Sequence, residues 1–318
     1  MRTRNIPRFV GIDVSKAILD VQVRPSRESF SVANAADGIA DMTARLVKIK
    51  PKLVVLEATG GLERLAVRAL DAAGIRVAVV NPRQVRDFAK ATGELAKTDA
   101  IDSAVIAHFA EAIHPEPRPL PDEEAQYRDE IQTRRRQLVG LLATERNHLA
   151  SAPAHLRDAI SKHIEQLQGL IKDVDTQLRE LIAADKELSA KAKLLQSVKG
   201  VGEVTSTVLI VGLPELGTLD RREIAKLVGV GPLSDDSGKR NGKRSCWGGR
   251  KDVRTALYMP TLSAVKYNPV IKPFYDSLVA RGKPHKVAMV ACIRKLLIIL
   301  NAMVRSNTPW TPALAFPR

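Results

Sequence analysis

The sequence predicts an α/β domain over residues 1–121, a coiled-coil or helical-hairpin arm over 122–193 and a mostly α-helical domain over 194–318. Three observations support this division. Short apolar strands alternate with helical segments in the first part, apolar residues recur at helical spacing in the second, and positive charge is concentrated in the third. A chain of 318 residues is also too long for one core of ordinary size, which favours several domains.

Charge is distributed unevenly along the chain. The formal net charge is +15, and residues 197–318 alone hold 20 Lys and Arg against 8 Asp and Glu. A surplus concentrated in one third of a chain indicates a polyanionic partner such as nucleic acid. The two cysteines form neither a disulfide framework nor a paired metal site, and no apolar segment follows the charged N-terminus. We therefore expect a cytoplasmic, nucleoid-associated protein with no membrane partner.

The first two predicted strands form a hairpin over residues 9–23. A β-branched run ends beside Asp13, passes a short polar turn and resumes as an alternating strand. A carboxylate at the buried end of a strand is costly unless it is paired or holds a cation. Asp13 is therefore a candidate ligand, although an aspartate that merely caps a turn fits the same position.

Strands and helices continue to alternate after this hairpin. Strands are predicted at residues 29–33, 52–57 and 75–82, and helices at residues 37–49 and 62–73. The helix at 37–49 has a plausible cap at Asn34 or Asp37. The strand at 52–57 ends on Glu57, which repeats the arrangement around Asp13, and residues 83–94 form a polar and basic segment.

A second pair of carboxylates lies on a helix that Thr98 is predicted to cap. Asp99 and Asp102 are three residues apart, share one helix face and repel each other unless a cation lies between them. In a ribonuclease-H-like sheet the first and fourth strands are neighbours, so the carboxylates of Asp13 and Glu57 would converge. Four carboxylates that hold two Mg²⁺ ions form a site for phosphodiester chemistry.

The middle of the chain predicts two long helices that meet around Pro153, after a stiff, proline-rich linker at 114–121. A near-heptad apolar seam is formed by Ile164, Leu167, Ile171, Val174, Leu178, Leu181 and Ile182. Because this arm is nearly neutral, we expect it to act as a spacer or an oligomerisation element.

The basic C-terminal part opens on a glycine turn within residues 195–206 that resembles a helix-hairpin-helix element. Lys199, Gly200 and Gly202 would then offer charge and backbone N–H groups to a phosphate. A glycine turn that only joins two packed helices fits the sequence equally well.

A long glycine-rich segment follows at residues 229–250. It contains six glycines and five basic residues without apolar periodicity, which is typical of a functional or disordered loop. The basic residues in and just after this segment are further expected nucleic-acid contacts: Lys239, Arg240, Lys243, Arg244, Arg250 and Arg254.

Several motifs together resemble those of the DEDD-type insertion-sequence transposases, whose catalytic domain is RuvC-like. In the N-terminal half these are Val10–Lys16, Leu56–Gly60, Asn81–Pro82 and Lys97–Asp102. In the C-terminal half, in the order found in that family, they are Gly200–Gly202, Gly229–Pro232, Asp236–Gly238, Gly248–Gly249 and Arg254–Met259.

This resemblance implies a DNA recombinase that excises and inserts its own mobile element, guided by an element-encoded bridge RNA that pairs with donor and target DNA. It implies a Mg²⁺-binding quartet of Asp13, Glu57, Asp99 and Asp102, and a homo-oligomer that ranges from dimer to tetramer. It further implies that Ser237 forms a covalent phosphoserine link to DNA, whereas Ser234 and Ser245 of the same loop do not precede a glycine. The serine loop would have to reach the acidic site, and glycines 238, 242, 248 and 249 would permit that movement.

Three other functions remain open from the sequence. A junction-resolving or RNase-H-type nuclease needs the carboxylates and metals but no serine, and a non-catalytic nucleic-acid-binding protein would use the carboxylates structurally. An actin-like ATP-binding fold also begins with an aspartate-bearing strand, but it needs phosphate loops, for which Gly60–Gly61 is a weak candidate.

Overall fold

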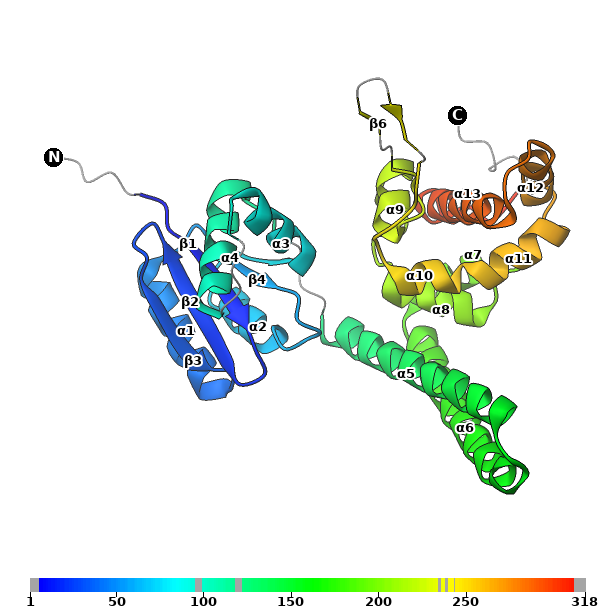
Figure 1. Cartoon of the computed structure of the whole chain (residues 1–318), viewed down its shortest axis with the longest axis horizontal. Helices are drawn as coiled ribbons and strands as arrows, with labels where there is room; N and C mark the ends of the chain where they lie inside the picture. The colour runs from blue at the N-terminus through cyan, green and yellow to red at the C-terminus, as the bar shows by residue number, and fades with distance from the viewer. Residues whose placement is uncertain are drawn as a thin grey trace. The chain divides into compact units, whose positions relative to one another are not determined.

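The protein divides into two compact units, Met1–Leu120 and Pro121–Arg318, each with its own apolar core (Figure 1). The computed structural model describes residues 6–94, 99–117, 122–233, 236–237, 240–242 and 244–311. The helical arm and the C-terminal helices belong to one unit. A separate domain boundary near residue 193 stays a prediction.

The first unit is built on a five-stranded mixed sheet with the strand order β3-β2-β1-β4-β5. The strands are β1 (Phe9–Val14), β2 (Ile18–Arg24), β3 (Ser29–Ala33), β4 (Leu53–Glu57) and β5 (Val77–Val80). β1, β2 and β3 are successive antiparallel neighbours, whereas β4 pairs in parallel with both β1 and β5. The predicted α/β domain and its N-terminal hairpin are confirmed.

Helices cover both faces of this sheet (Figure 1). Residues of α1 (Ala36–Ile49) and α2 (Arg64–Ala72) pack with Val10 and Ile12 of β1 in one cluster. Residues of α3 (Pro82–Ala91) and α4 (Asp99–Ile113) pack with Phe9 in another. Because side chains alternate along a strand, the odd-numbered positions of β1 face α4.

One local prediction is wrong in this unit. The N-cap of α1 is Ala35, whose side chain makes no capping hydrogen bond, whereas Asn34 or Asp37 was the expected cap. Asn34 instead donates its side-chain amide to the carbonyl oxygens of Ser15 (2.9 Å) and Leu62 (3.3 Å), so it joins three loops, and Asp37 lies in the first turn of α1. The polar and basic segment at 83–94 holds most of α3, which Asn81 caps by accepting a hydrogen bond from the backbone N–H of Arg83 (2.9 Å).

The second unit begins with the predicted helical hairpin. α5 (Glu123–Ser151) and α6 (Ala154–Ala184) pack around Leu138, Leu142 and Leu167. The second helix does not continue to residue 193, as the apolar pattern predicted. It ends at Ala184, and Asp185 caps a new helix, α7 (Lys186–Gln196), by accepting two backbone hydrogen bonds.

The remaining helices share one apolar core with α13 (His285–Ser306), whose residues Leu296, Leu297 and Leu300 are fully buried. They are α8 (Glu203–Gly212), α9 (Arg221–Val228), α10 (Lys251–Ala256), α11 (Tyr258–Tyr267) and α12 (Ile271–Ala280). Helix α13 packs on α7, α9, α11 and α12. Among the described helices, α13 alone is long and apolar enough to cross a membrane. Because 56% of its apolar window is buried inside the protein, it has the character of a core helix.

Candidate active site

Asp13 and Glu57 end two neighbouring parallel strands. The register of β1 and β4 pairs Ile12 with Leu56, so Asp13 and Glu57 are the next residues on each strand. Both carboxylates are half-buried, and strand alternation assigns both to the face that α4 covers. The two strand ends therefore present two carboxylates side by side.

Gly11 is the point at which α4 crosses β1. A Cβ atom at Gly11 would lie 2.1 Å from the backbone nitrogen of Ala107 and 2.5 Å from the carbonyl oxygen of Ser103. These contacts are with helix backbone, which cannot move aside as a flexible side chain would. Glycine at this position therefore allows the helix to lie directly on the strand. The motif Val10–Lys16 contains this glycine, but its packing role was not predicted.

The direction of α4 brings its first turn toward Asp13. At the other end of the helix, the ring of His114 lies 4.9 Å from that of Phe9, so α4 runs antiparallel to β1. Asp13 lies about 7 Å beyond Gly11 at about 3.3 Å per residue. The same distance corresponds to four or five residues of helix at about 1.5 Å each. Counted back along α4 from the crossing point, these residues reach the turn that holds Asp102.

The acidic residues do not form a complete metal site in the part of the chain that the structure describes. Asp102 is half-buried and lies in the first turn of α4, whereas the side chain of Asp99 and the whole of Thr98 lie outside the described residues. Within these limits, no group of three or more His, Cys, Asp or Glu side chains is placed to hold a metal. The donors that do approach this edge are carboxylates, which suit a hard cation such as Mg²⁺.

Asp20 is an acidic neighbour that the sequence analysis missed. It lies opposite Asp13 in the antiparallel β1–β2 pair, and its Oδ1 accepts a hydrogen bond from the hydroxyl of Ser31 (2.5 Å). Directly opposite residues of an antiparallel pair share one face of a sheet. Their register depends on the hairpin turn, which the sequence pattern alone did not specify.

The backbone N–H groups of the glycine turn after β4 are already bonded to the side chain of Glu63. Glu63 Oε2 accepts hydrogen bonds from the backbone N–H groups of Thr59 (3.1 Å) and Gly61 (2.9 Å) and from the Thr59 hydroxyl (3.1 Å). A phosphate loop needs such N–H groups for its ligand. Their use by Glu63 argues against the actin-like ATP-binding alternative.

Ser237 lies in a short β-ribbon of the second unit. β6 (Asp236–Ser237) pairs with β7 (Arg240–Asn241), and Leu233 pairs with Ser245 nearer the base. Because Ser237 pairs with Arg240, only two residues connect the strands at the tip. The predicted irregular loop is thus a ribbon, although the side chains of Ser237 and Arg240, and the whole of Ser234, Lys239 and Lys243, lie outside the described residues.

The base of this ribbon is closely packed. A Cβ atom at Gly249 would lie 2.4 Å from the backbone nitrogen of Gly229, and one at Gly229 would lie 2.1 Å from the carbonyl oxygen of Gly248. Arg254 donates to the carbonyl oxygens of Val228 (3.1 Å) and Gly248 (2.6 Å). Gly249 therefore serves close packing, and its use in a movement of the serine loop stays a prediction.

Two of the residues predicted to contact nucleic acid form hydrogen bonds within the second unit. Arg250 binds both carboxylate oxygens of Glu215 (2.6 Å each) and the carbonyl oxygen of Gly212 (2.9 Å). Arg254 holds the ribbon base, as described above. Such bidentate and multiple hydrogen bonds position backbone segments. Arg244, in contrast, is exposed. Contact of any of these three with nucleic acid stays a prediction.

The glycine turn joins α7 and α8, and its resemblance to a helix-hairpin-helix element stays a prediction. Gly200 has a positive φ of 102°, and a Cβ there would lie 2.9 Å from the carbonyl oxygen of Pro260. Gly202 is the N-cap of α8, and the Nζ atom of Lys199 lies 5.4 Å from the ring centroid of Tyr267. Phosphate binding at this turn stays a prediction.

The two cysteines have the separate, unpaired character that the sequence indicated. Cys246 is exposed and Cys292 is buried in the core of the second unit. Burial raises the pKa of the Cys292 thiol to about 11, so this side chain remains a protonated, apolar core residue.

An α/β sheet with carboxylates at one edge, joined to a basic helical unit, defines a nucleic-acid-processing enzyme. Matches to two family models identify the family of this enzyme. Residues 10–160 match a transposase model of the DEDD, IS110 type, and residues 192–276 match the model for transposases of the IS116/IS110/IS902 family. These two segments make up most of the chain, which belongs to the IS110 family of transposases. It is a DNA transposase and recombinase.

Individual relatives agree with this assignment. The chain is 27% identical to the pilin gene-inverting protein of Moraxella bovis over 318 residues, which covers 95% of this chain and 97% of that protein. The protein of the same name from Moraxella lacunata matches to the same extent. An insertion element IS110 protein of 43.6 kDa from Streptomyces coelicolor is 29% identical over 134 residues, or 41% of this chain and 33% of that protein.

Proposed function

We propose that this transposase cleaves and rejoins DNA at an acidic site formed by Asp13, Glu57, Asp99 and Asp102, in a first unit of the RuvC type. The observation that carries the proposal is the contact of α4 with Gly11. That contact directs the first turn of α4 toward the end of β1, where Asp13 and Glu57 are already neighbours. This arrangement supports an acidic site to which three separate chain segments would contribute.

The all-oxygen donor set fits a divalent cation, in our proposal two Mg²⁺ ions per site. When bound, such ions lower the barrier by activating the attacking oxygen and stabilising the leaving oxygen. Asp13 and Glu57 are held by strands in the middle of the sheet, which makes their positions rigid. Asp102 is held by α4, and this helix is in turn anchored on β1.

The proposed nucleophile is Ser237. Its hydroxyl oxygen attacks a DNA phosphorus, a phosphoserine bond forms, and a DNA hydroxyl leaves with the proton that the serine gives up. Rejoining reverses these steps, because a DNA hydroxyl attacks the phosphoserine and the serine is released with a proton. A serine hydroxyl is a weak nucleophile and needs a base or a metal for activation. The position of Ser237 at the end of β6, where it pairs with Arg240 of β7, supports this role.

The proposed partners are donor DNA, target DNA and a guide RNA encoded by the element, and the protein would associate with the nucleoid. The charge surplus of residues 197–318 supports binding of polyanions. Inversion of a DNA segment, which the name of the Moraxella relatives describes, requires the same cleavage and rejoining.

The proposed oligomer, a dimer that pairs into a tetramer, would form through the helical arm. Large apolar side chains on α5 and α6 remain 41–50% exposed, although the hairpin seam itself is filled. They are Val139, Leu141, Leu156 and Leu170. Apolar side chains outside a filled seam favour association with a second copy.

Removal of RNA and of metal tests this function. The purified chain is treated with ribonuclease and EDTA and then mixed with labelled DNA that carries an element end and a target. We expect strand exchange to be lost, because both the pairing partner and the counter-charge for the carboxylates are gone. Exchange should return only when the element's transcript and Mg²⁺ are both restored. Exchange by the RNA-free protein would contradict RNA guidance, and exchange in EDTA would contradict the metal site. Mg²⁺-dependent hydrolysis without rejoining would favour the nuclease alternative.

A further inference from the structure

The edge of the sheet opposite the carboxylates is positively charged. Each of the three parallel strands is preceded directly by a cation: Arg8, Lys52 and Arg76. Backbone hydrogen bonds tie these positions together, from Lys52 N–H to the Arg8 carbonyl oxygen (2.7 Å) and from Val54 N–H to the Arg76 carbonyl oxygen (2.9 Å). Arg8 is partly committed, since it donates to the carbonyl oxygen of Ile49 (3.1 Å). Lys52 and Arg76 are both exposed.

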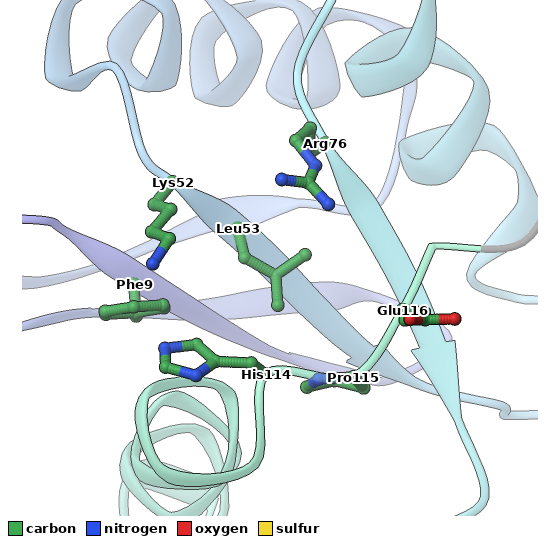
Figure 2. Close-up of a pocket in the computed structure, with 7 residues that line it drawn as sticks. All are labelled: Phe9, Lys52, Leu53, Arg76, His114, Pro115 and Glu116. Carbon is green, nitrogen blue, oxygen red and sulfur yellow. The ribbon is translucent and has the colours of Figure 1, made fainter.

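A small hollow of about 240 Å³ lies at this edge (Figure 2). Its lining combines aromatic, apolar and charged side chains and includes Phe9, Lys52, Leu53, Arg76, His114 and Glu116. Figure 2 shows the Lys52 ammonium and the Arg76 guanidinium on either side of Leu53, with the rings of Phe9 and His114 on the Lys52 side. The Phe9 and His114 ring centroids are 4.9 Å apart, and Lys52 Nζ lies 5.6 Å from the Phe9 centroid.

We propose that this hollow binds one nucleotide of a single-stranded nucleic acid, with the base against the exposed His114 ring and the phosphate on Lys52 and Arg76. Phe9 is only 3% exposed and supports the His114 ring from the core. Single-strand sites combine a cationic surface for the backbone with aromatic rings for the bases. Phe9 and Leu53 belong to the packed core of the unit, so the feature that points to a base is the exposed His114 ring beside the two exposed cations. The volume of about 240 Å³ is below that of an ordinary ligand pocket of about 300–1,000 Å³, so the hollow would hold no more than a single base.

This site is distinct from the acidic one. Phe9 and Asp13 are four residues apart on β1, which corresponds to about 13 Å. The hollow therefore holds a flanking strand and does not touch the phosphate that reacts. The proposal relies on the protein's action on nucleic acid but not on the proposed metal or serine chemistry, so it survives if Ser237 is not the nucleophile.

The main test measures binding of fluorescent 12-nucleotide strands, one RNA and one DNA of the same sequence, to the full-length protein over a range of salt. In the double variant Lys52→Gln/Arg76→Gln we expect about tenfold weaker binding at low salt. The slope of log affinity against log salt should become shallower by about 0.7 to 1.4, for one or two lost phosphate contacts. Arg86→Gln/Lys90→Gln is the matched control, since it removes two exposed cations from α3 of the same unit.

Two single variants test the base and the opposing charge. His114 has a positive φ of 51°, so His114→Asn keeps a residue that tolerates this conformation while it removes the ring. We expect about fivefold weaker binding from the lost stacking. Glu116→Gln should instead strengthen binding a few-fold, because it removes a carboxylate that repels the phosphate.

Ultraviolet cross-linking locates the strand directly. Strands that carry 5-bromouridine or 5-bromodeoxyuridine should cross-link to peptides that contain Phe9 or His114. An effect on RNA alone assigns the strand to RNA, an effect on DNA alone assigns it to DNA, and an equal effect shows that the site accepts either. Unchanged affinity in the double variant, an equal loss in the α3 control, or cross-links confined to the second unit would overturn the proposal.

Gly11→Ala tests how closely the positions of α4 and the carboxylates depend on each other. The added Cβ would overlap helix backbone, so we expect a clear fall in the urea midpoint of unfolding. Strand exchange should fall as well, because α4 must move away from β1. Gly140→Ala is the control, since a Cβ there meets nothing within 4 Å and should raise the urea midpoint slightly by favouring α5. Both are measured by urea denaturation, and normal stability of Gly11→Ala would contradict the packing argument.

Discussion

Asp13→Asn should abolish strand exchange while the protein still folds and binds nucleic acid. The amide keeps the shape of the side chain but removes the charge that a divalent cation requires. Loss of one such electrostatic contribution to a phosphoryl transition state corresponds to a fall of about 10³-fold or more in rate. The measurement is single-turnover cleavage of labelled DNA in Mg²⁺, with the thermal unfolding midpoint recorded in parallel.

The control for this prediction is Asp71→Asn, which removes an exposed carboxylate at the end of α2 in the same unit. It should leave the rate unchanged. Asp20→Asn is a more informative companion, because Asp20 lies opposite Asp13 in the sheet. A large effect of Asp20→Asn would extend the acidic site to β2. Full activity of Asp13→Asn would remove Asp13 from the site altogether.

Ser237→Ala should eliminate the covalent protein–DNA adduct and, with it, strand exchange. Without the hydroxyl this residue has no oxygen with which to form a phosphoserine bond. Binding of DNA and RNA should persist, since backbone pairing between β6 and β7 does not involve the side chain. The adduct is measured as a labelled band that survives denaturation in detergent.

Ser234→Ala and Ser245→Ala are the matched controls within the same segment. Ser245 pairs with Leu233 through backbone atoms alone, with N···O distances of 2.9 and 3.3 Å, so its hydroxyl is not needed for the ribbon. Both variants should form the adduct at normal yield. An adduct that persists in Ser237→Ala would move the nucleophile elsewhere, and the lack of any adduct in the unaltered protein would favour a hydrolytic nuclease.

Local patterns predicted the secondary structure around the acidic residues well. Asp13 and Glu57 end strands because continuous β-branched runs precede them, and α4 begins at Asp99 in the segment where helical spacing starts. The exceptions share one cause, which is competition from distant partners. Asn34 did not cap α1 because its amide bonds to two other loops, and residues 233–245 form a ribbon through pairings that span up to 12 positions.

The chain alone determined which residues are available for chemistry and in which kind of element each one lies, because strand and helix periodicity depends on neighbouring residues. Only the tertiary structure decided which of them meet. Gly11 contacts Ser103 of α4, which is 92 positions away in the sequence. Arg250 binds Glu215, which is 35 positions away. The hollow likewise brings together Lys52, Arg76 and His114, which are far apart in the sequence. Such encounters depend on how whole elements pack, and packing is a property of the folded chain that no local window of sequence contains.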